Sequence, residues 1–141
     1  MIDREFIVEK INLITRDLKR LGVFSDLSID QISEDFINFA ALKNILMVTI
    51  GRAIDINEHL IYELAGPDIE APKTYRETFT ILGDLDILPK DFGEDISRSA
   101  GLRNVIVHEY NDLNKVVIYK KVGDAISQYV KYCDYILKYL K

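Results

Sequence analysis

The sequence predicts an all-α protein, an antiparallel bundle of about five helices. Apolar residues recur at three- and four-residue spacing along most of the 141 residues, and no stretch alternates with the period of two expected of a half-buried strand. The main helix breakers, Gly66-Pro67 and Pro89, stand between these periodic stretches. Because no repeat or low-complexity linker divides the chain, we expect a single domain over residues 1–141.

The first two helices follow from long apolar series. In residues 3–21 the periodic positions are Ile7, Ile11, Ile14, Leu18 and Leu21. Gly22 follows as a C-terminal stop. A long second helix starts near Ser28 or Asp30 and meets no breaker except Gly51 before the Gly-Pro pair. At ~1.5 Å per residue it would be roughly 50 Å long, so we expect it to project past its own core toward another chain.

Three more helices complete the predicted bundle. Thr74 and Glu77 have the spacing of a capping box, which opens the third helix. Pro89 suits the first turn of a fourth helix, which we expect to end near Tyr110. The last helix covers about residues 113–140, where the apolar period resumes.

The composition is that of an ordinary soluble globular protein, with 48% hydrophobic and 29% charged residues. Cys133 is the single cysteine, which excludes an internal disulfide and fits a reducing cytoplasm. No apolar run approaches the ~20 residues needed to span a bilayer, and the N-terminus lacks the pattern of a signal peptide. We therefore expect a cytoplasmic protein with no membrane contact.

Charge is distributed unevenly along this acidic chain. Residues 1–97 hold 10 Lys and Arg against 19 Asp and Glu, a net charge of −9, whereas residues 98–141 hold 8 against 4, a net charge of +4. Binding of a polyanion depends on the local field rather than on the overall charge of −5. If the protein binds nucleic acid, the C-terminal part is the expected place.

Residues 101–110, GLRNVIVHEY, open this basic part of the chain. At about 100° per residue, one half of the helix carries a guanidinium, an amide, an imidazole and a phenol. These belong to Arg103, Asn104, His108 and Tyr110. The other half, which we expect to face the core, carries Leu102, Val105 and Ile106.

Such a polar face has the groups needed to cleave RNA without a metal ion. An imidazole, with a reference pKa of ~6.5, can take or give the proton of a ribose hydroxyl near neutral pH. A guanidinium binds phosphate oxygens in a bidentate way. The reaction needs a base and an acid, so we expect a symmetric dimer to bring two copies of Arg103 and His108 together. The plain alternative is an Arg and a His on a solvated helix face.

The motif resembles a known family signature. Residues 103–110 match the R-x4-H-x-Y pattern of HepT-like proteins, which belong to the HEPN superfamily of all-α domains. Residues 54–61, 72–79 and 82–89 also resemble the corresponding segments of that family. The resemblance covers essentially the whole chain and implies a HEPN-like bundle with one long second helix.

The resemblance implies the toxin of a type VII toxin–antitoxin system. Such toxins are metal-independent endoribonucleases that act as homodimers and use no cofactor. The resemblance implies that Arg103 and His108, which match the Arg and His of the family signature, are the catalytic residues. The family's partner is a minimal nucleotidyltransferase antitoxin of the MntA type, which would transfer AMP to Tyr110. Asn104 is expected to orient His108 or to contact phosphate, and Asp55 is expected to support the site.

Two interpretations remain open for Asp55 and His59. Either they assist catalysis, His59 as a second imidazole, or they form a surface ion-pair cluster with Arg52. We expect no metal site, because two histidines and one cysteine offer no set at ligand spacing. An alternative to the enzyme is a non-catalytic helical subunit that docks a nucleotidyltransferase or helps to hold its nucleotide or substrate.

Overall fold

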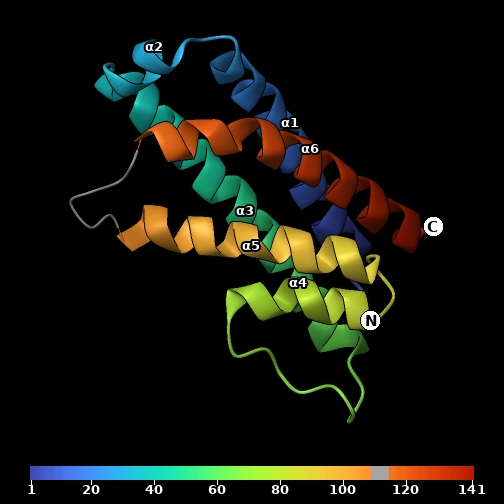
Figure 1. Cartoon of the computed structure of the whole chain (residues 1–141). Helices are drawn as coiled ribbons and strands as arrows, with labels where there is room; N and C mark the ends of the chain where they lie inside the picture. Colours follow the sequence, from blue (N-terminus) through green and yellow to red (C-terminus); the bar gives the residue numbers. More distant parts are fainter. Residues whose placement is uncertain (109–114) are drawn as a thin grey trace.

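The computed structural model describes residues 1–108 and 115–141, and over these residues the chain is all-helical (Figure 1). The helices are α1 (Arg4–Ser25), α2 (Ile29–Ser33), α3 (Phe36–Leu64), α4 (Tyr75–Asp84), α5 (Lys90–His108) and α6 (Lys115–Leu140). The central helix is α3, which contacts each of the other described helices. One side of α3 is covered by α1 and α6, and another by the adjacent pair α4 and α5. The predicted all-α bundle is confirmed.

The long second helix differs from its prediction because it is divided in two. Ser28 and Gln31 form a capping box that starts the short helix α2. The Asp35 side chain then accepts hydrogen bonds from the backbone amides of Ile37 and Asn38, and so caps a new helix. As a result α3 has 29 residues and is roughly 44 Å long rather than 50 Å.

By length and composition alone, α3 is the one described helix that could cross a membrane, with a mean hydropathy of 1.3 in its most apolar window. This corrects the expectation that no apolar stretch approaches the required length. The central helix of a soluble protein passes the same test, and between Phe39 and Ile61 α3 buries a row of apolar side chains against its neighbours, whereas Phe36, Ile37 and Tyr62 near its ends are exposed. Burial in the core therefore accounts for part of the apolar composition of α3.

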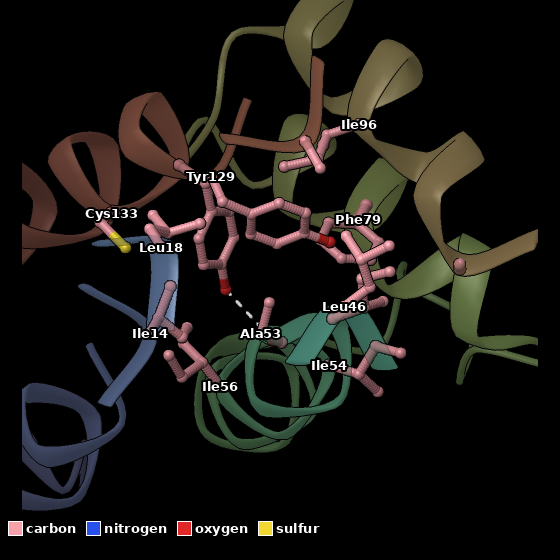
Figure 2. Packing of buried hydrophobic residues seen from close by; sticks show 14 of the residues in the cluster. Ile14, Leu18, Leu46, Ala53, Ile54, Ile56, Phe79, Ile96, Tyr129 and Cys133 are labelled. Atoms are coloured by element: carbon pink, nitrogen blue, oxygen red, sulfur yellow. Dashed lines mark hydrogen bonds between the residues drawn. The ribbon is translucent and has the colours of Figure 1, made fainter. Parts of the chain in front are cut away.

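A chain of buried polar groups crosses the core from α6 to α4. The Tyr132 hydroxyl lies 2.6 Å from Asn57 Oδ1 and 3.1 Å from the Ala53 carbonyl oxygen, the latter contact dashed in Figure 2. Asn57 Nδ2 donates to Thr78 Oγ1 at 3.1 Å, and the Thr78 hydroxyl donates to the Tyr75 carbonyl oxygen at 2.6 Å. Because buried polar groups are costly without partners, this chain fixes the start of α4 relative to α3.

Two glycines allow α4 and α5 to approach closely. A Cβ atom on Gly93 would lie 3.1 Å from the Phe79 carbonyl oxygen, and one on Gly83 would lie 3.4 Å from the Lys90 Cα. Gly93→Ala is therefore expected to destabilise the fold by about 1–3 kcal/mol, since backbone would have to shift. Gly123→Ala, at an exposed position in α6 with no atom within 4 Å, is expected to stabilise it by roughly 0.5–1 kcal/mol. Urea unfolding measures the free energy of unfolding of both variants. A change of equal size and sign in Gly93→Ala and Gly123→Ala would contradict the close contact between α4 and α5.

Asp17 is a buried carboxylate held by three arginines from α1 and α3. Its oxygens pair with Arg52 Nη1, with Arg16 Nε at 3.3 Å and with Arg20 Nη1 at 3.2 Å. Burial raises the pKa of Asp17, but the hydrogen bonds and charges of Arg52 and Arg16 outweigh burial, so the pKa is lowered overall.

The lowered pKa of Asp17 predicts a loss of stability in acid. The contribution is fully present above the unfolded pKa of about 3.9 and is lost as the pH falls through the lower folded pKa. Asp17→Asn is expected to lower stability at pH 7 and to remove part of the loss of stability seen in acid, when urea unfolding is followed from pH 7 down to about pH 2. Asp95→Asn, which breaks an exposed pair with Arg98, is the matched control and is expected to change little.

Candidate active site on α5

The polar motif lies on the last turns of α5. Ala100 and Ile106 are buried and Leu102 is half-buried, so these residues set the face of α5 that points inward. Val105, which was expected to face the core, is 54% exposed instead. The reason is that α5 runs antiparallel to α4 and continues beyond the residue at which α4 begins, so its last turns are covered on fewer sides (Figure 1).

Arg103 lies across α3 and α4. Its Cζ is 5.1 Å from the centroid of the Tyr75 ring, at the start of α4. Its Nε passes over Gly51 of α3, where a Cβ atom would be 3.6 Å away. This Nε is buried, and among residues 1–108 and 115–141 it has no hydrogen-bond partner. Within the same described part of the chain, no carboxylate forms an ion pair with Arg103.

A pocket of about 360 Å³ brings Arg103 together with residues of α1, α3 and α4. Its charged lining residues are Lys10, Arg52, Asp55, Glu58 and Arg103. Asp55 lies here, with its Oδ2 3.1 Å from Lys10 Nζ. The structure therefore places Asp55 in the same pocket as Arg103, although Lys10 rather than Arg103 is its partner.

Asn104 borders a second hollow of about 450 Å³ on the other side of the α4 start. Tyr75 and Glu58 border both hollows, so the two adjoin there. The Asn104 side chain is exposed, and this makes its amide available to a ligand that lies along α5.

His108 is the last residue of α5 and is exposed. It borders neither hollow, so within one protomer the structure does not bring its imidazole into the Arg103 pocket. Five residues along a helix separate the two by about 7.5 Å of axial rise. Tyr110 lies outside the described residues, so its predicted place beside Arg103 stays a prediction.

The other histidine, His59, makes contacts that stabilise the fold. Nε2 of His59 accepts a hydrogen bond from the Asp3 backbone amide at 2.9 Å, and its ring packs against Phe6 at 5.4 Å between centroids. Arg52 pairs with Asp17 in α1. The predicted cluster of Arg52, Asp55 and His59 is therefore not formed, since each residue has its partner in α1 or just before it.

Two lining residues were not predicted to belong to the site, although Tyr75 lies in residues 72–79, one of the segments that resemble the family. Lys10 and Tyr75 belong to α1 and α4, and only the packing of these helices on α3 brings them near Arg103. Among residues 1–108 and 115–141, no three or more His, Cys, Asp or Glu side chains gather where they could hold a metal ion.

Comparison with known proteins identifies relatives of similar length. The profile of the family described as "Ribonuclease HepT-like" matches residues 14–136. A tRNA nuclease HepT from Aphanizomenon flos-aquae is 32% identical over 141 residues, which cover 99% of this chain and 92% of that protein. An mRNA nuclease HepT from Shewanella oneidensis is 26% identical over 137 residues, covering 94% and 96%.

A solved structure of a related protein is similar to this chain over nearly its whole length. The tri-AMPylated Shewanella oneidensis HEPN toxin, in complex with MNT antitoxin, has a TM-score of 0.82 and 25% identity, and the match covers 98% of this chain and 99% of that one. The likeness therefore concerns the entire helical frame rather than the α5 motif alone.

Proposed function

The chain belongs to the ribonuclease HepT-like family and is an endoribonuclease, and from this premise we propose that it is the metal-independent toxin of a type VII toxin–antitoxin system. We assign catalysis to Arg103 and His108, with Asn104 and Asp55 in support. The main support for this proposal is the environment of Arg103. Its guanidinium lies beside a pocket and forms no ion pair with a carboxylate among the described residues.

The proposed reaction is an internal transesterification. The ribose 2′-oxygen loses its proton and attacks the phosphorus, the bond to the 5′-oxygen breaks, and that oxygen takes up a proton. The products are a 2′,3′-cyclic phosphate and a 5′-hydroxyl. Arg103 holds the non-bridging oxygens as negative charge builds on them. His108 transfers a proton, and a second imidazole supplies the other proton-transfer step.

The surface at the end of α5 supports a homodimer as the source of that second imidazole. Large apolar side chains are exposed where α5 ends and where α6 and α3 begin: Val105, Val107, Val116, Val117, Phe36 and Ile37. These starts are close in space, since Lys115 Nζ of α6 donates to the Ser33 carbonyl oxygen at 3.0 Å. Exposed apolar patches of this kind mark protein interfaces, and His108 lies at this end.

The same region supports RNA as the substrate. Lys115, Lys120 and Lys121 are exposed on the first turns of α6, near the end of the molecule where the apolar residues gather. A dimer formed there doubles this local positive charge at the shared site. An acidic chain can then attract a phosphate backbone, because a polyanion responds to the local field.

The partner in this proposal is a minimal nucleotidyltransferase antitoxin that adds AMP to Tyr110. The support is the AMPylated, antitoxin-bound state of the Shewanella oneidensis toxin. The cytoplasmic location predicted from the composition stays a prediction. The alternative, a non-catalytic subunit of a nucleotidyltransferase complex, shares the partner but not the chemistry.

Cleavage in the presence of EDTA separates these alternatives. The purified protein is expected to cut RNA in EDTA and to leave cyclic phosphate ends, because no step of the proposed mechanism uses a metal ion. End-group analysis of a labelled RNA measures the outcome. Intact RNA in EDTA, with cleavage restored by Mg²⁺, would contradict the mechanism. Intact RNA under both conditions, with the partner still bound, would favour the non-catalytic subunit.

A further inference from the structure

We propose that Tyr75 is a positioning residue for Arg103: its ring supports the guanidinium so that the N–H groups stay available for phosphate. This inference rests on the proposed function, because it assumes that Arg103 contacts the scissile phosphate. Tyr75 itself makes no contact with the reacting atoms in this account and acts through the arginine.

The contact uses the part of the arginine that phosphate does not need. Cζ of Arg103 lies over the Tyr75 ring, 5.1 Å from its centroid. An aromatic ring attracts a cation through its π face, whereas phosphate is bound by N–H groups at the edge of the guanidinium plane. A ring can therefore hold the cation in place without competing for its hydrogen-bond donors.

The alternative partners in the pocket would compete. Asp55 and Glu58 border the same pocket as Arg103, and either carboxylate could pair with a guanidinium that moved toward it. In the structure Asp55 pairs with Lys10 instead, and Gly51 lies close beneath the buried Arg103 Nε. The aromatic contact thus keeps Arg103 out of an ion pair that RNA would have to break.

Tyr75 is fixed by the fold on both sides. Thr74 caps α4 by accepting a hydrogen bond from the Glu77 backbone amide at 3.1 Å. The Tyr75 carbonyl oxygen accepts from Thr78, which is joined through Asn57 to Tyr132 in the core. Asn57, Thr78 and Tyr132 are essentially fully buried, so the start of α4 has little freedom to move. Tyr75 as a residue is 44% exposed, which leaves the site open to a large substrate.

Kinetics of three variants test the inference. Tyr75→Leu is expected to lower kcat for RNA cleavage about tenfold with KM changed less than about twofold, since the guanidinium loses its support. Tyr75→Phe keeps the ring and is expected to cleave at the wild-type rate. Tyr139→Leu, which removes a similarly exposed tyrosine at the far end of α6, is the matched control and is expected to cleave like the wild type.

NMR of the arginine side chain gives a second measurement that does not depend on activity. The ring current of Tyr75 is expected to shift the Arg103 Hε resonance upfield in the wild type and in Tyr75→Phe, and the shift is expected to vanish in Tyr75→Leu. An unshifted resonance in the wild type overturns the inference even if Tyr75→Leu does not fold.

The outcomes separate this inference from the proposed function. If Arg103→Ala cleaves RNA at the wild-type rate, the catalytic assignment of Arg103 is refuted. The NMR shift of Arg103 in the wild-type protein would still report on its contact with Tyr75. An inactive Arg103→Ala together with a fully active, folded Tyr75→Leu would overturn the positioning role alone. Equal losses in Tyr75→Phe and Tyr75→Leu would also overturn it, because the hydroxyl rather than the ring would then matter.

Discussion

Replacing His108 with alanine is expected to lower kcat for RNA cleavage by about 10²–10⁴-fold, the usual contribution of a proton-transfer residue. His108 is exposed on the last turn of α5, so the change opens no cavity. The free energy of unfolding is therefore expected to fall by no more than about 1.5 kcal/mol, the usual net contribution of one side-chain interaction. Single-turnover cleavage of a labelled RNA measures the first quantity, and urea unfolding measures the second.

His59→Ala is the matched control, since it removes the other histidine. His59 accepts a hydrogen bond from the Asp3 amide and packs on Phe6, so its loss is expected to cost about 0.5–1.5 kcal/mol of stability. Cleavage by the folded variant is expected to be unchanged. Loss of cleavage in His59→Ala, with cleavage retained in His108→Ala, would reverse the assignment of the two imidazoles.

Transfer of AMP to Tyr110 is expected to suppress cleavage almost completely. Each added nucleotide brings a negatively charged phosphate close to the motif, where it competes with RNA for Arg103. Tyr110→Phe is expected to cleave RNA like the wild type and to stay active after incubation with the antitoxin and ATP. Intact mass spectrometry, followed by the cleavage assay on the same sample, measures both effects.

Tyr62→Phe is the control for this experiment, because Tyr62 is the most exposed tyrosine of the described residues. This variant is expected to accept AMP and to lose activity like the wild type. If Tyr110→Phe still gains AMP and loses its cleavage activity, the modified residue is not Tyr110. AMP on Tyr110 without a loss of cleavage would refute modification as the means of inhibition.

Local patterns in the sequence were sufficient for the helices but not for every boundary. The apolar period and the Thr74 cap predicted α1, α4 and the general course of the bundle, since these signals act within one or two turns. The break between α2 and α3 was missed because the apolar series continues through it. The deciding group is the Asp35 carboxylate, which caps a new helix without interrupting the hydrophobic pattern.

The candidate site was only partly predictable for a related reason. Helical spacing places Arg103, Asn104 and His108 near one another along a single helix, and the structure confirms that all three lie on α5. Tyr75, Lys10 and the pairing of Asp55 depend on contacts between helices distant in sequence, which spacing within one helix does not encode. The helical period alone places Val105 in the core because it takes no account of where the neighbouring helix α4 begins.

Two copies of α5 contribute to one site in the proposed dimer, and mixing of subunits tests this most directly. Wild-type protein is combined with an equal amount of His108→Ala under conditions that exchange subunits, and the initial rate of RNA cleavage is measured at constant total protein. If each phosphodiester needs a histidine from both copies, only wild-type pairs are active and the rate falls to about one quarter of the wild-type rate. A rate of about one half would mean that each protomer cleaves RNA by itself, which would contradict the shared site.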